Sequence, residues 1–511
     1  MNNMVKSMNP AWWVERWALL NPDRLALGFG ETRISWAELN TRVRRAARAL
    51  AGLGIEKGDR VAVMMDNRPE FLEVFLACCR LGAIFVPLNF RLTAGELDYL
   101  LSHCRPRLLV YSHKFISTVS TLSMSLYRMP PLMAQVGGRL EGQALDWAEE
   151  VAAAQPNGEL PAGSLAPGDP EEPQVIMYTS GTTGRPKGAV LSHRKTFFNC
   201  LNAEIFFKLH EDDLMLVVLP LFHSGGLFIQ SAPCLYKGVG MIIHENFDPD
   251  RVLADVERHR VSKFLGVPYV YRQLLAHPGL AGADLSSLAV CAIGGEKVTP
   301  ELLAGCEAAG FPPRQIMGQT ETSILLWASE SESRKRPGTV GRPVFHAEVR
   351  LLDKQGNQPE PGEVGEIVVR GPVLMKEYWN DPAASEAAMK GGWLKTGDLA
   401  RMDEDGYFYL VDRAKDMYIS GGENVYPAEV ERVLTSHPAV AEAAVVGVSH
   451  QRWGEAGKAY IVCKPGQSVC AEELLNLCQG RLAKYKWPAD FIFDPDLPRT
   501  PLGKIRKFLL R

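Results

Sequence analysis

The hydrophobic pattern predicts alternating helices and strands from residue 31 onward. Apolar positions recur at helical spacing after Ser35, and residues 58–64 are typical of a turn followed by a buried strand. Residues 69–80 are then helical, and residues 82–87 form another short apolar run. A strand, a helix and a strand in this order imply parallel pairing, because the helix carries the chain back along the sheet. The pattern therefore predicts an α/β fold with parallel-rich sheets flanked by helices.

The same alternation continues as far as residue 317. The pattern predicts strands at 214–219, 239–243, 263–267, 288–293 and 314–317, and helices at 194–209, 249–259, 268–276 and 300–309. Polar or glycine-rich residues stand where three of these strands stop, at His223, at 294–296 and at 318–321. In open α/β sheets, ligands bind beyond the carboxyl ends of the strands. We therefore expect these segments to line one cleft.

The last third of the chain has a different pattern. Short β runs and turns begin near Gly341 and imply a small β unit. Beyond Arg413, strands at 443–448, 459–463 and 491–493 and a helix at 471–482 imply a compact α+β domain. We predict an N-terminal domain over residues 1–411, a hinge over 412–416 and a C-terminal lid domain over 417–511.

Composition narrows the classes of function. Hydrophobic residues make up 46% and charged residues 23% of the 511 residues, and a net charge of −3 gives no field that would attract nucleic acid or an anionic membrane. The longest apolar run, residues 71–90, contains Glu73 and Arg80 and is too polar to form a transmembrane segment. The first residues lack the apolar core of a secretory leader, so we expect a cytoplasmic enzyme. Ten cysteines without a C-x-x-C pair favour reduced thiols and argue against a zinc site.

One polar loop carries the clearest chemistry. Residues 178–188, Y-T-S-G-T-T-G-R-P-K-G, combine hydroxyl side chains, glycines and Lys187. Glycines let backbone N–H groups turn inward while hydroxyls and an ammonium add donors, so this composition suits a phosphate. Apolar runs at 174–177 and 189–191 predict that the loop joins two strands, so phosphate binding here would not depend on a helix dipole. The alternative interpretation is a solvated turn.

The loop resembles the signature loop of the adenylate-forming superfamily, which includes acyl-CoA synthetases, luciferases and the adenylation domains of peptide synthetases. Four further segments are similar to the family's motifs and follow in the family's order, at 318–321, 396–399, 412–416 and 498–504. The resemblance runs along essentially the whole chain. It implies a large N-terminal domain and a small mobile C-terminal domain.

The resemblance implies a role for each motif. Thr320 would meet the α-phosphate, and Glu321 would hold Mg²⁺ with Thr183, since Mg²⁺ takes hard oxygen ligands and few protein carboxylates. Asp398 would accept from both ribose hydroxyls, as an ionised carboxylate can. Lys504, a compact cation on a long stem, would bridge carboxylate and phosphate oxygens. The implied ATP contacts are Thr179, Ser180, Gly181, Thr182, Thr183, Gly184, Lys187, Gly294, Gly295, Glu296, Met317, Gly318, Gln319, Thr320, Asp398, Arg413 and Lys504.

Each motif also has a plainer interpretation on its own. Thr320 can cap a helix with an acidic residue in its first turn, and Gly397 can mark a simple turn. Lys504 taken alone is a surface charge, and a lone histidine such as His223 is more often structural. The family also carries an aromatic residue where this chain has Met317, whose thioether can still pack on a ring.

The resemblance also places the acyl and CoA sites. His223 matches the position that gates the acyl pocket, and residues 220–226 lack the acid that amino-acid-activating relatives use to hold an ammonium. The implied pocket residues, mostly apolar and therefore suited to an aliphatic or aromatic acid, are Phe222, His223, Gly226, Val267, Pro268, Met317 and Gly318. The implied CoA contacts are Gly421, Gly422, Glu423, Arg91, Trp453, Tyr485 and Lys486. Lys415 matches the hinge position.

We therefore predict an AMP-forming acyl-CoA synthetase that uses ATP, Mg²⁺ and coenzyme A. A carboxylate and ATP would give an acyl-adenylate and pyrophosphate, and the CoA thiol would then displace AMP. The candidate catalytic residues are Lys504, Thr183, Glu321, Lys187 and His223. Two alternatives stay open: an adenylating enzyme that serves a carrier protein or another acceptor, and a nucleotide-binding module without turnover. The sequence leaves open which acid is used and whether the chain forms a homodimer.

Overall fold

The computed structural model describes residues 7–123, 130–140, 144–155, 169–179, 186–295, 298–413, 416–420, 423–451, 453–479, 481–482, 484–494, 496–499 and 505–510. The chain divides into two compact units. Unit 1 comprises Met1–Gly181, Arg185–Val349 and Val369–Leu394, and unit 2 comprises Thr182–Gly184, Arg350–Val368 and Lys395–Arg511.

A nine-stranded sheet forms one half of unit 1, with the strand order β16-β15-β14-β13-β12-β10-β11-β1-β2. The strands from β14 to β1 pair in parallel, and β2, β15 and β16 pair antiparallel at the edges. Their bounds are β1 Leu25–Phe29, β2 Thr32–Ser35, β10 Leu214–Val217, β11 Gly240–Ile243, β12 Lys263–Gly266, β13 Val290–Gly294, β14 Pro313–Gln319, β15 Ser323–Ala328 and β16 Arg342–Pro343.

An eight-stranded sheet forms the other half, with the order β19-β9-β8-β4-β3-β5-β6-β7. The strands from β8 to β7 pair in parallel, whereas β9 runs antiparallel to both β8 and β19. Their bounds are β3 Arg60–Met64, β4 Ile84–Pro87, β5 Leu108–Ser112, β6 Leu132–Val136, β7 Leu145–Asp146, β8 Pro173–Thr179, β9 Lys187–Ser192 and β19 Glu377–Tyr378. The predicted phosphate loop therefore connects two antiparallel neighbours, as its apolar flanks indicated.

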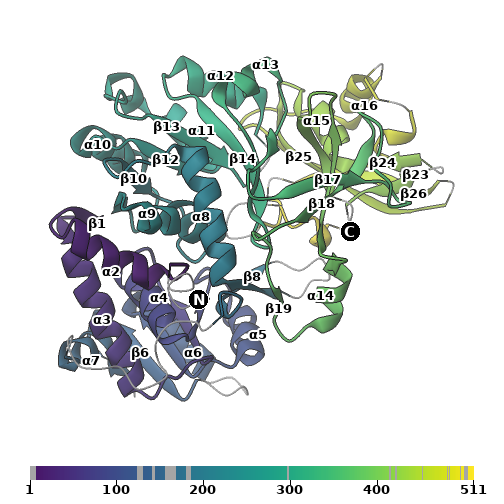
Figure 1. Ribbon diagram of the computed structural model, residues 1–511. Helices are drawn as coiled ribbons and strands as arrows, with labels where there is room; N and C mark the ends of the chain where they lie inside the picture. The colour runs from purple at the N-terminus through teal and green to yellow at the C-terminus, as the bar shows by residue number, and fades with distance from the viewer. Residues whose placement is uncertain are drawn as a thin grey trace. The chain divides into compact units, whose positions relative to one another are not determined.

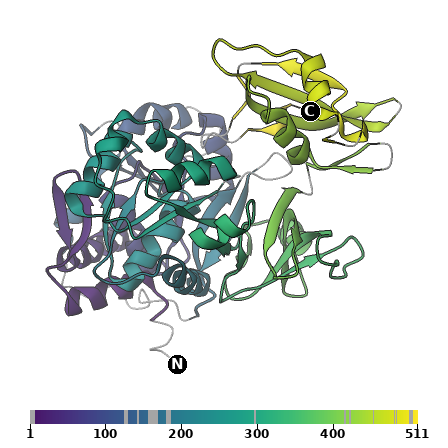
Figure 2. The same cartoon turned by 90° about the horizontal axis from the view of Figure 1, so that it is seen from above.

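Alternate residues of a strand face different cores, as the twofold period of a strand requires. In β10, Met215 and Val217 belong to a large central cluster, whereas Leu216, together with Val218 just after the strand, belongs to a second cluster with α10, α11 and α12. Helices accordingly lie on both sides of the strands of unit 1 (Figures 1 and 2). The helices of the central cluster include α2 Pro10–Leu20, α3 Trp36–Gly52, α4 Pro69–Leu81, α7 Trp147–Ala153, α8 His193–Phe207 and α9 Ala232–Lys237. The outer helices include α5 Ala94–Cys104, α6 Ile116–Ser123, α10 Pro249–His259, α11 Pro268–Leu275 and α12 Pro300–Ala308.

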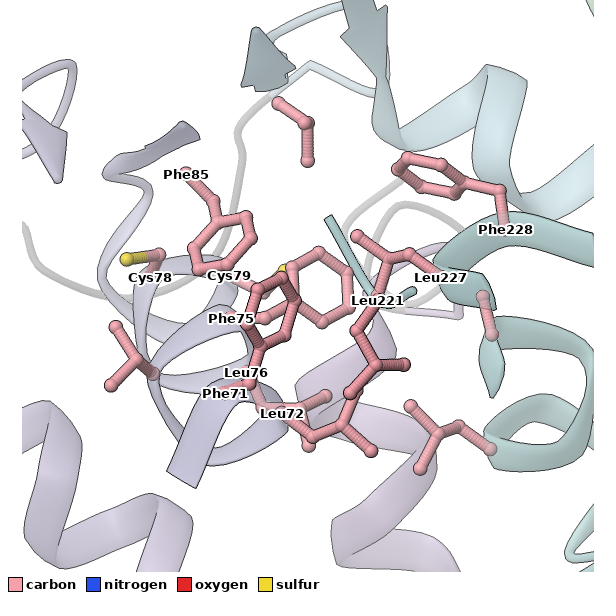
Figure 3. Close-up of a cluster of buried hydrophobic side chains, with 14 of the residues drawn as sticks. Phe71, Leu72, Phe75, Leu76, Cys78, Cys79, Phe85, Leu221, Leu227 and Phe228 are labelled. Atoms are coloured by element: carbon pink, nitrogen blue, oxygen red, sulfur yellow. The ribbon is translucent and has the colours of Figure 1, made fainter. Parts of the chain in front are cut away.

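The central cluster joins the two sheets (Figure 3). Phe75 of α4 meets Phe85 of β4 edge to face at 5.4 Å between ring centroids, and it meets Phe228 in the same manner at 6.4 Å. Edge-to-face pairs bring the positive edge of one ring to the negative face of the other. Because β4 lies in one sheet and Phe228 follows β10 of the other, α4 is packed between them.

Outside these two sheets, the chain forms two smaller ones. One has the order β17-β18-β21-β20 with β22 paired to β21, and the other has the order β24-β23-β26-β25 with β27 paired to β26. The bounds are β17 Glu348–Leu352, β18 Val364–Arg370, β20 Met389–Lys390, β21 Trp393–Met402, β22 Phe408–Arg413, β23 Tyr418–Ser420, β24 Glu423–Val425, β25 Val440–His450, β26 Gly454–Cys463 and β27 Asp490–Phe493, with helices α15 Pro427–Thr435 and α16 Ala471–Cys478.

Most predicted elements are present, with shifted ends. The predicted helix at 471–482 ends at Cys478, because Gln479 has extended backbone angles. The suggestion that Thr320 caps a helix is wrong: β14 continues to Gln319 and returns as β15. All ten cysteines are free thiols, and most are buried, as predicted. No helix in the described part of the chain is long and apolar enough to cross a membrane.

Candidate active site in unit 1

Four adjacent parallel strands end at the predicted acyl and adenine residues. Met317–Gly318 lie near the end of β14, and Gly294–Gly295 lie at the end of β13. Val267–Pro268 follow β12, and Phe222–His223 come after β10. Parallel neighbours place their carboxyl ends at the same edge of the sheet. The structure therefore gathers these four segments at one edge. The sequence pattern predicted three of them, those at His223, Gly294 and Gly318.

Glycines at this edge allow backbones to approach closely. A Cβ atom on Gly294 would lie 2.4 Å from the carbonyl oxygen of Ile316, and one on Gly226 would lie 2.4 Å from that of Pro220. Gly295 has φ +84°, in the left-handed region that favours glycine. Each of these positions therefore requires glycine for a steric or conformational reason.

The motif 318–321 forms a tight β-hairpin. Gly318 pairs with Ile324 and Gln319 pairs with Ser323, with the register shifting between Met317 and Gly318. A Cβ atom on Gly318 would lie 1.8 Å from the carbonyl oxygen of Ser323, so no larger residue fits. Ser323 itself has φ 58°, a conformation that few non-glycine residues adopt. In three-residue hairpin loops, the turn is commonly followed by a residue in the left-handed conformation, which forms a β-bulge.

Glu321, at the turn of this hairpin, joins three segments of unit 1. Its Oε1 atom accepts hydrogen bonds from the hydroxyl of Tyr378 at 3.0 Å and from that of Thr179 at 3.4 Å. The backbone N–H of Met375 donates to the carbonyl oxygen of Glu321 at 2.7 Å. Thr179 is the last residue of β8, so the end of the phosphate-loop strand lies against the predicted metal ligand.

Tyr378 was not singled out in the sequence, because its two-residue strand has no periodicity to recognise. Burial, reinforced by the charge of Glu321, raises the pKa of Tyr378 well above its usual range, so the phenol remains a hydrogen-bond donor. The Nζ atom of Lys187 lies 5.1 Å from the centroid of the Tyr378 ring, in a cation–π contact. Lys187 and Glu321, predicted from separate motifs, thus share one neighbour.

Lys195 of α8 is a second residue that the sequence pattern missed. It is 1% exposed, its Nζ donates to the hydroxyl of Ser323 at 2.5 Å, and it lies 6.0 Å from the ring centroid of Phe228. Burial lowers the pKa of Lys195 to about 7, although the negative charge of Glu321 opposes that shift. A possible signal was the spacing of Lys195 and Asn199, two polar residues four apart on the buried face of α8.

The predicted gate residue His223 is exposed and lies just before a π-helix, Gly225–Ser231. Its Nδ1 accepts from the backbone N–H of Gly225 at 3.3 Å. π-helical turns are rare and occur frequently at functional sites. The neighbouring Phe222 is buried and packs edge to face on Phe90, with ring centroids 5.1 Å apart.

Arg91, predicted as a CoA contact, packs over the rings of Phe90 and Phe222 at 5.6 and 6.0 Å. Burial lowers the pKa of its guanidinium. Arg91 therefore contacts a predicted pocket residue from outside the loops that carry the motifs.

Unit 2 holds the predicted ribose residues. Asp398 and Arg413 are direct partners in the β21–β22 register, so the two residues assigned to the ribose stand side by side. Asp398 is buried, and its backbone N–H donates to the hydroxyl of Thr396 at 3.1 Å. Gly397 has φ +73°, which favours glycine at this position.

Among the CoA candidates of unit 2, Lys486 is paired with Glu429 at 2.7 Å. Its ammonium also lies 5.7 Å from the ring centroid of Tyr485. Trp453 is 42% exposed. Binding a CoA phosphate through Lys486 would therefore compete with an existing ion pair.

Several predicted residues lie outside the described residues, namely Ser180, Gly181, Thr182, Thr183, Gly184, Glu296, Lys415, Gly421, Gly422 and Lys504. The side chains of Arg413 and Glu423 lie outside them as well.

The described residues contain no group of three or more His, Cys, Asp or Glu side chains suited to a metal ion. A Mg²⁺ ion that is held mainly by substrate phosphates needs only one or two protein carboxylates, so a single Glu321 fits this ion. In the described residues, both side-chain hydrogen bonds to Glu321 end on Oε1.

Comparison with known families and structures identifies the chain. Residues 14–379 match the AMP-binding enzyme family, and residues 429–504 match the AMP-binding enzyme C-terminal domain. The chain is 41% identical to a feruloyl-CoA synthase of an Amycolatopsis species over 505 residues, covering 97% of each chain. It is 38% identical to an indoleacetate–CoA ligase of Aromatoleum aromaticum over 496 residues, covering 97% of this chain and 96% of the relative.

Solved structures agree with these relatives. The o-succinylbenzoate CoA synthetase MenE of Bacillus subtilis, in complex with its acyl-adenylate intermediate, superimposes with a TM-score of 0.86 at 34% identity, covering 98% of this chain and 97% of that one. ATP-bound MatB of Rhodopseudomonas palustris superimposes with a TM-score of 0.89 at 31% identity, covering 99% and 98%. The chain therefore belongs to the AMP-binding enzyme family, and within that family to the acid–CoA ligases.

Proposed function

We propose that this ligase activates an aromatic carboxylic acid. The observation that carries the proposal is the edge of the nine-stranded sheet, where apolar residues stand beside the Glu321 hairpin. Phe222, Val267 and Met317 end or follow neighbouring strands there. Flat apolar rings suit such surroundings. Relatives named for feruloyl, indoleacetate and 2-succinylbenzoate substrates support the same class of acid.

In the first half-reaction, a carboxylate oxygen attacks the α-phosphorus of ATP and pyrophosphate leaves. Catalysis would depend on holding the two anions together and offsetting their charge. Lys187 and the hydroxyls of residues 179–183 would surround the phosphates, and Lys504 would bridge carboxylate and phosphate oxygens. Asp398 and Arg413 would hold the ribose, an assignment supported by their pairing across β21 and β22.

Bound Mg²⁺ would neutralise charge on the phosphates of ATP. Glu321 would hold it through the oxygen that does not accept from Tyr378 and Thr179. A bound Mg²⁺ in a MenE complex with ATP supports the cofactor, although it belongs to that relative.

In the second half-reaction, the CoA sulfur attacks the acyl carbon, the bond to the phosphate oxygen breaks, and AMP leaves. We propose that residues 417–511 act as a lid that turns about Lys415 between the two steps, because Lys504 and Gly421–Gly422 must address the same carbon in turn. The pantetheine would run past Gly421, Gly422 and Glu423. Arg91, Trp453, Tyr485 and Lys486 are the candidate contacts for the CoA nucleotide.

A panel of acids tests the proposal. Purified enzyme would be mixed with ATP, Mg²⁺, CoA and one acid each from the cinnamic, arylacetic, succinylbenzoic and saturated fatty classes, and AMP formation would be measured. We expect an aromatic acid to give the highest kcat/KM. A fatty acid preferred over every aromatic acid would overturn the substrate class while leaving the reaction intact. Pyrophosphate release without any CoA dependence would point to another acyl acceptor.

A further inference from the structure

We propose that Lys195 is a positioning residue for adenylate formation, because it holds Ser323 and thereby fixes the turn that presents Glu321. The inference rests on the proposed role of Glu321 as the magnesium ligand. Lys195 belongs to none of the motifs that define the predicted site, and it lies on α8, underneath the hairpin.

The burial of Lys195 needs an explanation. Within the described chain it has no carboxylate partner at ion-pair distance, and its ammonium contacts only the hydroxyl of Ser323 and the face of Phe228. A buried ammonium without a carboxylate is unfavourable, and an apolar residue of similar length would pack there at lower cost. Lys263 provides the contrast, since it is also buried but pairs with Asp213 at 3.2 Å. Residues that break a general rule of burial in this way are expected at functional positions.

Ser323 is the point through which Lys195 acts. This serine is 1% exposed and has φ 58°, so its conformation is strained and must be held by its surroundings. Its carbonyl oxygen occupies the space that a Cβ atom on Gly318 would need. The hydrogen bond from Lys195 holds the side chain of Ser323 in place. It thereby stabilises the left-handed backbone conformation of Ser323 that closes the turn.

Glu321 is held in the same turn from the other side. Tyr378 and Thr179 donate to its carboxylate, and Met375 donates to its carbonyl oxygen. Those hydrogen bonds fix the position of the Glu321 carboxylate only if the backbone of the turn stays in place. Lys195 supplies that support through its hydrogen bond to Ser323.

The test compares Lys195→Met with Ser323→Ala, their double variant and the matched control Lys263→Met. Three quantities would be measured: single-turnover adenylate formation, thioester formation from supplied acyl-adenylate, and the thermal shift caused by ATP with and without Mg²⁺. The last needs no acid, so it tests Lys195 even if the assigned acid is wrong. Failure of the proposed substrate class would show as a parent enzyme that prefers a fatty acid in the acid panel, whereas failure of the Lys195 proposal would show only in the comparison of variants.

We expect Lys195→Met to slow adenylate formation about tenfold or more, as expected when a catalytic group loses its orientation. The Mg²⁺-dependent part of the ATP thermal shift should disappear, and thioester formation should stay within about twofold of the parent. Ser323→Ala should act in the same direction, and the double variant should be no worse than Lys195→Met, because residues in contact are not additive. Lys263→Met should lower the melting temperature without changing the ratio of the two half-reactions.

Equal losses in both half-reactions for Lys195→Met, or an unchanged Mg²⁺-dependent thermal shift, would reduce Lys195 to a structural residue. If Lys195→Met does not fold, Ser323→Ala carries the test by the same criteria, and parental values in that variant would overturn the proposal.

Discussion

Units 1 and 2 hold their predicted site residues in different ways. In unit 1, Glu321, Thr179 and Tyr378 come from three separate segments, and the hydroxyls of Thr179 and Tyr378 both donate to the Glu321 carboxylate. In unit 2, the charged residues near the predicted CoA and hinge segments pair within their own domain, as Lys486 does with Glu429 and Lys507 with Glu431. The first arrangement is a network that links three segments through one carboxylate. The second consists of separate pairs that share no member.

The difference suggests how substitutions will behave. A change in the unit 1 network disturbs several contacts at once, since its members share Glu321. A change in unit 2 removes one group and should affect the half-reaction that uses this group. Four substitutions test that division between the units.

Removing the lysine of the final motif should have the largest effect. Lys504→Ala should slow adenylate formation on the order of 10²-fold or more, because a preorganised charge is lost from the transition state. Thioester formation from supplied acyl-adenylate should survive. Rapid-quench measurement of each half-reaction separates the two. If both slow equally, Lys504 does not serve a single step and the contrast between the units fails.

Restricting the predicted hinge should affect the other half-reaction. Proline fixes φ near −65°, and hinges absorb large changes in backbone angles, so Lys415→Pro should trap one arrangement. Adenylate should still form in a single turnover, while CoA-dependent thioester formation should fall about tenfold or more. Lys415→Ala, which leaves the backbone free, is the control. Thioester formation at the parental rate from both ATP and isolated adenylate would place the hinge elsewhere.

Neutralising Glu321 tests the network of unit 1. Glu321→Gln keeps an oxygen that can accept from Tyr378 and Thr179, but it removes the negative charge that suits Mg²⁺. Adenylation should fall about tenfold at moderate Mg²⁺ and recover in part as Mg²⁺ is raised. The measurement is a Mg²⁺ titration of pyrophosphate release. An unchanged midpoint would leave Glu321 with only its role in linking segments.

Removing one hydroxyl from the network should have the smallest effect. Tyr378→Phe deletes the 3.0 Å hydrogen bond to Glu321 but keeps the ring under Lys187. A typical hydrogen bond contributes about 0.5–1.5 kcal/mol net, so adenylation should slow about tenfold or less. The effect should vanish in a Glu321→Ala background, which lacks the acceptor for Tyr378, if the two residues act as a unit. Additive losses would mean that Tyr378 acts independently of Glu321.

The sequence determined the fold class and the placement of most motifs. Period-two and helical patterns predicted the strands β3, β4, β10, β12 and β13 and the helices between them, because those segments are short, apolar and bounded by turn residues. The rule that ligands gather beyond parallel strands then placed His223, Gly294 and Gly318 at one edge. That inference needs only strand order and direction.

Other features were decided by tertiary structure alone. The conformation after Gly318 depended on whether β14 found an antiparallel partner, and pairing with β15 excluded the helix that Thr320 and Glu321 would otherwise have suited. Tyr378 and Lys195 have no local signal, since one lies in a two-residue strand and the other sits on a helix of mixed polarity. Segments far apart in the sequence bring Tyr378 into contact with Glu321, and they bring Lys195 into contact with Ser323. Local pattern determines which elements form, whereas the contacts between distant side chains exist only once those elements have packed.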